Sequence, residues 1–347
     1  MKKKEKGTLY GNKAFRIMII GTLIMLLATV STVILFTYVM NRLGNMEDAS
    51  NTQFSGHYVF IADNEEAFWQ EVYEAASRQA EEDGIYIEYL EKSLGVNYTN
   101  YDLFRVAINS SVDGIIYGGT PDTQISKLIN IAVGDGIGVV LLQNDADNSR
   151  RQCYVGVNNY ELGQVYAGQL ARMFPTSEYG EKKVNIILNS NVPEGVGNLF
   201  AIAIEDYFTE NFLDYGVPEI EIVRVETQDI FSVEEDVRNL LLQDVLPDAM
   251  ICLNSTYTQC VFQALVDLNK VGETQLVGYF VNDNILEAID KQIIYSTVSI
   301  DTEQMGKSSV LALEEFCNYG YTNSYVPVSV SVIGKKEARS MIDDKDE

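Results

Sequence analysis

The residues from Ile17 to Met40 form an uncharged apolar run, and this run constrains the fold and the location of the chain more than any other feature. At about 1.5 Å per helical residue it reaches about 36 Å, which is enough to cross a bilayer with some tilt. The cationic residues ahead of it are Lys2, Lys3, Lys4, Lys6, Lys13 and Arg16. Because cationic flanks stay on the cytoplasmic side, we expect a basic cytoplasmic segment at 1–16 and a transmembrane helix at 17–40.

The remainder of the chain is expected to lie outside the cell. The run is longer than the apolar core of a cleaved signal peptide, and no small-x-small cleavage site follows it. The first cysteine is Cys153, so no cysteine near the end of the run can accept a lipid. We therefore expect a single-pass protein of the cell membrane with an extracytoplasmic main domain, joined to its helix by a flexible polar linker at 41–56.

The charge of the outer part excludes one large class of partner. The whole chain carries a net charge of −25, and the part after the apolar run has 19 cationic against 49 acidic residues. Such a surface repels phosphate backbones, so nucleic acid is not an expected partner. With 46% apolar residues the chain is nevertheless globular, and roughly 300 residues outside the membrane favour two lobes.

Strand-like and helix-like segments alternate along this outer part. Tyr58–Ala62 is a short apolar run, and after it apolar residues recur at helical spacing up to Ala80. In the second half, Val184–Leu188 precedes an apolar helix near Leu199–Phe208. Alternation of this kind predicts an α/β fold with parallel sheets covered by helices on both faces, here two Rossmann-like lobes. A strand at 326–333 ends the pattern, and residues 335–347 are expected to be a charged, frayed tail.

The four cysteines show no C-x-x-C spacing. One or two disulfides are compatible with an extracellular location, but the irregular separations favour four free, packed thiols.

Several stretches match a known superfamily in order and spacing. They are VDGII at 112–116, SRR at 149–151 leading into YVGVNN at 154–159, DAMICLN at 248–254, VGY at 277–279 and Met305-Gly306. From His57 to Ile333 the chain resembles the type I periplasmic binding proteins, in particular the ribose- and galactose-type sugar binders, whose lobes sugar-responsive repressors share.

The resemblance implies a hinge of three chain crossings, near Asn158, Ile300 and Asn323. Lobe 1 would then contain residues 57–158 plus 301–323. Lobe 2 would contain residues 159–300 plus 324–334.

Ligands of open α/β sheets bind beyond the carboxyl ends of the strands. Aromatic rings there can stack on the apolar face of a sugar, and amides can bind its polar edge. The resemblance and the strand ends select as ligand-binding candidates Asp63, Asn64, Phe68, Trp69, Gln143, Asn144, Asn198, Asn254, Tyr257 and Phe280. Trp69 and Tyr257 also fit core packing, and Asp63 and Asn64 also fit the capping of a helix.

The chain departs from the sugar binders at several of these positions. Gln143 and Asn144 replace an acid and an arginine, Asn198 replaces an arginine at a helix start, and Phe280 replaces an acid. Ile300 stands where an amide or an acid is common. Amides, aromatics and aliphatics suit a neutral ligand with fewer hydroxyls, or a pair of lobes that binds nothing.

Two functions follow, and two others are not expected. The lobes would close over a small neutral, sugar-like ligand, either for uptake through the permease of an ABC importer or as a signal to a membrane histidine kinase. His57 is the only histidine and begins a strand, away from the cleft, and the sequence has no His/Cys metal motif or phosphate loop, so we expect neither an enzyme nor a cofactor. A repressor would need a basic DNA-reading headpiece, but the apolar run occupies its place.

Overall fold

The computed structural model divides the chain into two compact units, Met1–Gln53 and Phe54–Glu347, which we describe separately. The residues that it describes are 19–21, 23–27, 29–32, 54–62, 67–94, 98–146, 148–190, 192, 194–225 and 230–346. The described residues of the first unit are helical. No helix of the described residues is both long enough and apolar enough to span a membrane. The basic segment 1–16, most of the linker and half of the predicted transmembrane run lie outside the described residues.

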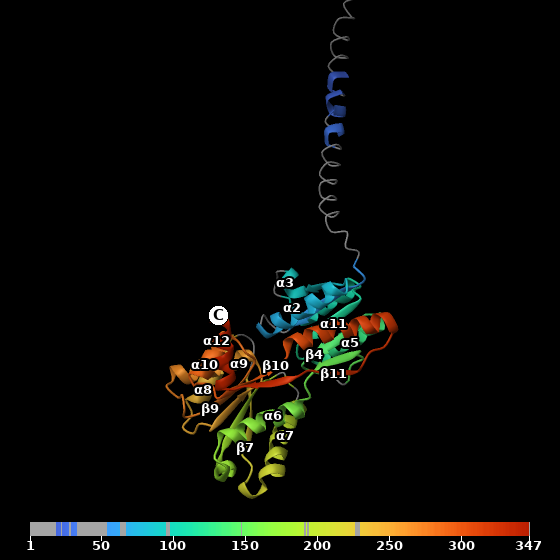
Figure 1. Cartoon of the computed structure of the whole chain (residues 1–347). Helices are drawn as coiled ribbons and strands as arrows, with labels where there is room; N and C mark the ends of the chain where they lie inside the picture. The colour runs from blue at the N-terminus through green and yellow to red at the C-terminus, as the bar shows by residue number, and fades with distance from the viewer. Residues whose placement is uncertain are drawn as a thin grey trace, which may run out of the picture. The chain divides into compact units, whose positions relative to one another are not determined.

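Lobe 1 of the second unit is a six-stranded sheet in the order β11-β5-β4-β3-β1-β2, with every neighbouring pair parallel. Figure 1 labels β4 and β11 of this sheet. Its strands are β1 (His57–Ala62), β2 (Tyr86–Tyr89), β3 (Gly114–Gly118), β4 (Gly138–Leu142), β5 (Cys153–Gly156) and β11 (Tyr325–Pro327). Its helices are α2 (Ala67–Glu82), α3 (Leu90–Leu94), α4 (Asn100–Asn109), α5 (Thr123–Gly134) and α11 (Thr302–Tyr319).

Lobe 2 has a second six-stranded sheet, in the order β12-β10-β9-β8-β6-β7, in which only β12 runs antiparallel to its neighbour. Its strands are β6 (Lys183–Asn189), β7 (Glu219–Val225), β8 (Ala249–Cys252), β9 (Gln275–Tyr279), β10 (Ser296–Ile300) and β12 (Val330–Ile333). Its α-helices are α6 (Asn159–Met173), α7 (Glu194–Phe212), α8 (Ile230–Leu241), α9 (Ser255–Asp267), α10 (Asp283–Asp290) and α12 (Lys335–Asp346), with short 3₁₀ turns at Thr176–Glu181 and Leu213–Tyr215.

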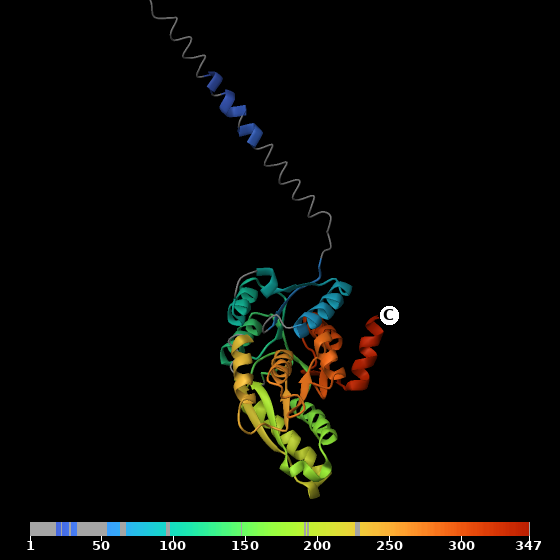
Figure 2. The ribbon, with the colours of Figure 1, turned by 90° about the vertical axis from the view of Figure 1, so that its left-hand side faces the viewer.

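Both faces of each sheet are buried, as the alternation predicts. In β1, Val59 and Ile61 pack with α4 and α5, while Tyr58 and Phe60 point to the other face, where α2 and α11 lie side by side (Figure 2). The core of this second face continues into lobe 2 beneath α6 and α7. The two lobes are therefore joined by one apolar cluster as well as by the chain crossings.

Two chain crossings lie where the resemblance implies, between β5 and α6 and between β10 and α11. The third lies later than expected. Residues 324–334 were assigned to lobe 2, but Tyr325–Pro327 forms β11 and pairs with β5 in lobe 1. The Tyr325 ring stacks on Tyr154 at 5.6 Å between centroids, and this contact holds the strand to lobe 1 until after Pro327. The expected strand at 326–333 is thus two strands in two sheets.

The C-terminal segment, expected to fray, is the helix α12, which packs against α10. Ala338 is fully buried, Ile342 packs against the lobe 2 core, and Arg339 pairs with Asp290 at 3.2 Å. The segment is rich in charged residues, but Ala338 and Ile342 lie four residues apart and form an apolar stripe on one face of the helix. All four cysteines are free, but Cys317 is exposed, unlike the packed thiol that was expected.

Candidate ligand-binding cleft

A cavity of about 120 Å³ lies at the carboxyl ends of the strands and takes its lining from both lobes. Lobe 1 and the first crossing contribute Trp69, Gly119, Thr120, Gln143, Asn144 and Val157. Lobe 2 contributes Asn159, Leu162, Ile187, Leu188, Asn189, Val192, Val196, Phe200, Leu253, Asn254, Tyr257 and Ile300. Within the part of the chain that the structure describes, none of the lining residues is charged.

Trp69 is both a cavity-lining residue and a core residue, the two positions that its place in the sequence allows. It lines the cavity from the first turn of α2, yet it is only 5% exposed. Its indole lies directly over the end of β3: a Cβ added to Gly118, the last residue of that strand, would come within 2.5 Å of the ring. Only glycine at this position lets the ring lie so close to the strand.

Phe68 and Phe280 connect the lobes behind the cavity and do not line it. Both are almost fully buried, and their rings meet edge to face at 5.7 Å. Phe68 also lies 5.7 Å from the ring of Tyr279. Phe280 has a positive φ of 71°, which is uncommon for a bulky side chain, and its backbone is held by bonds to Val298 and Thr297 in β10.

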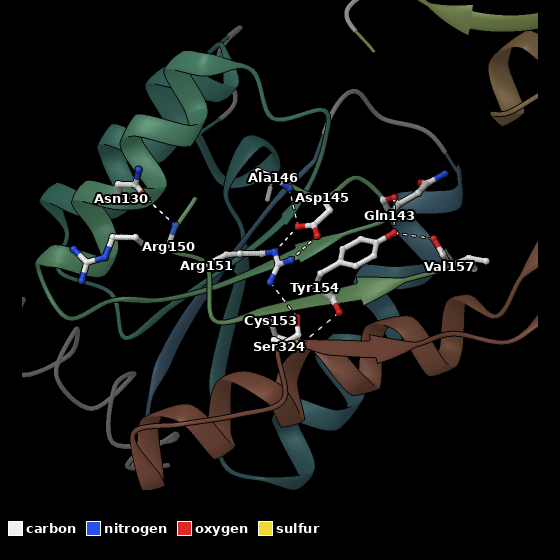
Figure 3. Close-up of polar contacts among 10 residues, drawn as sticks. All are labelled: Asn130, Gln143, Asp145, Ala146, Arg150, Arg151, Cys153, Tyr154, Val157 and Ser324. Carbon is white, nitrogen blue, oxygen red and sulfur yellow. Dashed lines mark hydrogen bonds and ion pairs between the residues drawn. The ribbon is translucent and has the colours of Figure 1, made fainter. Parts of the chain in front are cut away.

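Gln143 reaches across the cleft. Its Nε2 donates to the Tyr279 hydroxyl of lobe 2 at 2.9 Å. Its backbone has a φ of 63°, and the Tyr154 hydroxyl lies 2.9 Å from its carbonyl oxygen and 2.9 Å from that of Val157 (Figure 3). Tyr154 thereby connects the turn after β4 to the first chain crossing.

An ion pair also stabilises the turn that carries Gln143. The Arg151 guanidinium makes two contacts to the Asp145 carboxylate and donates from Nη1 to the Ser324 carbonyl at 3.0 Å (Figure 3). Asp145 in turn accepts from the Ala146 N–H at 2.7 Å. In the sequence, Arg151 is part of the SRR stretch, and nothing in that stretch indicates a pairing with Asp145.

Two residues at the start of α9, Asn254 and Tyr257, line the cavity from lobe 2. Asn254 is the N-cap, and its Oδ1 accepts from the Tyr257 N–H at 2.7 Å. This bond uses Oδ1 and does not involve the Nδ2 group of Asn254. Tyr257 is buried and contributes its ring to the lining.

Asn144 and Asn159 are the amides with the most hydrogen-bonding capacity left. Neither side chain makes a hydrogen bond to another of the described residues. Asn159 was not predicted as a site residue. It opens α6 directly after the first crossing, and the YVGVNN stretch that ends with it could have drawn attention to it.

Five predicted site residues are not seen in the lining: Phe68 and Phe280, which pack between the lobes, and Asn198, Asp63 and Asn64. Asn198 is exposed on α7, because it is two residues from both Val196 and Phe200 and so points about 200° away from these lining residues. Asp63 and Asn64 lie outside the described residues.

Tyr166 supports the cavity from α6. Its hydroxyl lies 3.1 Å from the carbonyl oxygen of Cys252 and 3.3 Å from that of Gly278, and so links the ends of β8 and β9. Burial raises the pKa of this hydroxyl well above its ordinary value, so it stays neutral. No group of three His, Cys, Asp or Glu side chains that could hold a metal ion occurs among the described residues.

Comparisons with known proteins agree with this geometry. Residues 57–320 match the periplasmic binding protein domain family. A search of curated proteins gave no match. Among solved structures, the glucose-galactose binding protein GanP of Geobacillus stearothermophilus has a TM-score of 0.68 at 22% identity, covering 82% of this chain and 99% of its own.

Two further solved structures share the fold. A solute-binding protein of Burkholderia graminis in complex with D-arabinose gives a TM-score of 0.67 at 18% identity, covering 83% of this chain and 98% of its own. The XylFII–LytSN complex contains a chain with a TM-score of 0.65 at 22% identity, covering 81% of this chain and 99% of its own. The family match covers most of the chain and confirms the resemblance seen in the sequence: the chain belongs to the periplasmic binding protein domain family, with the type I fold of its sugar-binding members.

Proposed function

We propose that the chain is a non-enzymatic, extracytoplasmic solute-binding protein that closes its two lobes over a small neutral, sugar-like molecule. The observation that carries this proposal is the cavity itself, which both lobes line at the carboxyl ends of their strands. Its described lining offers amides, aromatic rings and aliphatic groups.

Closure of this kind requires contacts from both lobes, because a ligand shifts an equilibrium only by binding one state better than the other. Asn144 would bind from lobe 1, and Asn159 and Asn254 from lobe 2. A molecule that spans these amides favours the closed arrangement, in which the Gln143 side chain donates a hydrogen bond to the Tyr279 hydroxyl.

The electrostatics favour a neutral solute. The chain carries a net charge of −25, and the described lining contains no cation to compensate an anionic ligand. Sugar phosphates and sugar acids should therefore be rejected. With few charge-assisted bonds available, we expect micromolar affinity or weaker, at most about 8 kcal/mol of binding free energy.

In the cell, residues 17–40 would hold the protein at the outer face of the cytoplasmic membrane. There it would deliver its solute to the permease of an ABC importer. Signalling to a sensor kinase is the second candidate. An uncleaved anchor suits a fixed sensor complex, and XylFII, which shares the fold, is found in a complex with LytSN.

Calorimetry with neutral sugars, sugar phosphates and sugar acids tests the binding proposal, with Trp69 fluorescence as an independent signal. Asn144→Ala should weaken binding of the best neutral solute about tenfold, because it removes an amide that faces the ligand. Asn198→Ala is the matched control, since that side chain lies outside the lining. Binding of phosphorylated or acidic sugars alone would contradict the proposal.

Location and partner need separate measurements. Protease added to intact cells should release a soluble fragment that begins near Phe54. Crosslinking in the membrane should then recover a permease if the protein serves uptake, or a histidine kinase if it serves sensing. Protection of the domain from protease would overturn the proposed location.

A further inference from the structure

One part of the cavity is apolar and continuous. Val196 and Phe200 lie one turn apart on the same face of α7, and Leu188 lies at the end of β6 beneath them. A Cβ added to Gly197 would come within 2.9 Å of the Leu188 side chain, so helix and strand are in direct contact here. With Val192, these residues form what we call the apolar wall: Leu188, Val192, Val196 and Phe200.

The amides of the cavity have limited hydrogen-bonding capacity. The Nε2 group of Gln143 is used by Tyr279, and the Oδ1 atom of Asn254 is used by the Tyr257 N–H. The complete amides of Asn144 and Asn159 remain, together with Oε1 of Gln143 and Nδ2 of Asn254, whereas Asn189 and Thr120, which also line the cavity, have interactions within the chain.

A fully hydroxylated hexose does not match this distribution. It has hydroxyls around its whole edge, and a buried hydroxyl without a partner costs about 1–3 kcal/mol. Among the residues that the structure describes, the apolar wall provides no side-chain partner, so a hydroxyl placed against these residues would lose its bonds to water. An alkyl group in the same place would instead gain from burial.

We infer that the solute is a neutral deoxy sugar, a monosaccharide in which hydrogen replaces a hydroxyl and leaves a methyl or methylene group, bound with that group against the apolar wall. This inference rests on the proposed function and names the class of its ligand. It follows from Leu188, Val196 and Phe200, none of which was recognised in the sequence as a site residue.

Two pairs of sugars isolate the effect of one hydroxyl. L-fucose differs from L-galactose, and L-rhamnose from L-mannose, by the loss of the hydroxyl on carbon 6. An apolar pocket discriminates against an added hydroxyl by about 100-fold at most. For at least one of the two pairs, calorimetry should give the deoxy sugar about 10- to 100-fold tighter binding.

The variant Val196→Thr puts a hydroxyl into the wall at nearly constant size, so it should reduce this preference about tenfold, mainly by weakening deoxy sugar binding. Val266→Thr makes the same change on α9, where the side chain is 41% exposed, and should leave the preference unchanged. Urea unfolding of both variants verifies that they are folded.

The possible outcomes separate the two claims. A preference for the deoxy sugar that Val196→Thr reduces and Val266→Thr leaves intact supports the inference. Equal or tighter binding of the hydroxylated member in both pairs overturns the inference and leaves solute binding standing. Failure to bind any neutral sugar overturns the proposed function itself.

Discussion

The two lobes have sheets of the same strand order, but they contribute different chemistry to the cleft. Lobe 1 provides Trp69 and the pair Gln143 and Asn144 on a turn held by an ion pair and a tyrosine. Lobe 2 provides the apolar wall and the amides at the starts of α6 and α9. The shared topology decides where a ligand can bind, and the strand-end residues decide which ligand it is.

The lobes also end differently. The last strand of lobe 1, β11, is parallel to β5, whereas the last strand of lobe 2, β12, is antiparallel to β10. The chain thus passes along β11 in lobe 1 before it reaches lobe 2. Arg151 bonds to Ser324 just before β11, so the turn that carries Gln143 is tied to a hinge segment.

The largest expected effect comes from filling the space under Trp69. In Gly118→Ala, the new Cβ would lie 2.5 Å from the indole and displace it, at a cost of about 1–3 kcal/mol. Solute affinity should fall about 10- to 100-fold, and the Trp69 emission should shift. Gly168→Ala in lobe 2 is the control, because its Cβ would meet nothing closer than 3.7 Å. An unchanged spectrum and affinity would show that the ring does not serve the cleft.

The second prediction tests whether the lobe 1 turn is held by its ion pair. Arg151→Ala should lower the free energy of unfolding by about 2 kcal/mol, because it leaves the partly buried Asp145 without its partner. Arg78→Ala removes an exposed pair with Glu303 and should cost less than about 1 kcal/mol. Urea unfolding measures both. Equal losses in the two variants would refute the special role of the turn.

A smaller effect is expected from the contact between the lobes. Tyr279→Phe removes the bond to Gln143 and should destabilise the closed arrangement by about 1 kcal/mol, which weakens solute binding about fivefold. Tyr179→Phe deletes a hydroxyl that bonds to the Ala171 carbonyl within lobe 2, and it should leave affinity unchanged. Small-angle scattering reports on lobe opening. The contact is irrelevant to closure if Tyr279→Phe neither opens the lobes nor weakens binding.

The smallest effect concerns the thiols. Burial raises the pKa of Cys153 to about 12 and of Cys260 to about 11, so both stay neutral when folded. The unfolded chain loses these protons first, so their contribution to stability is complete below the ordinary thiol pKa and declines as pH rises toward 11. Urea midpoints measured between pH 7 and pH 10 should fall at the alkaline end.

Thiol accessibility gives a second test. A thiol reagent added to the native protein should label the exposed Cys317 and spare the buried Cys153 in lobe 1 and Cys252 and Cys260 in lobe 2. Rapid labelling of either lobe 2 cysteine would mean that its core opens readily. A urea midpoint that rises with pH would contradict the sign of the linkage.

Much of the fold could be predicted from the sequence, because buried parallel strands and covering helices leave local apolar patterns. The site could be predicted less well. Asn198 and Val196 lie two residues apart, and only the helix rotation decides which of them faces the cavity. Phe68 was expected to contact ligand, but it packs against Phe280 of the other lobe. Contacts between distant segments leave no local pattern in a sequence.

The sequence by itself determined the α/β alternation, the family and the replacement of charged residues by uncharged ones at positions 143, 144, 198 and 280, since these are properties of composition and local spacing. Tertiary structure alone decided that β11 belongs to lobe 1, that α12 packs on lobe 2, and that Leu188, Val196 and Phe200 form one wall. These outcomes depend on which surfaces meet when the two lobes fold. Burial and hydrogen bonding between residues far apart in the chain select them, and local propensity does not.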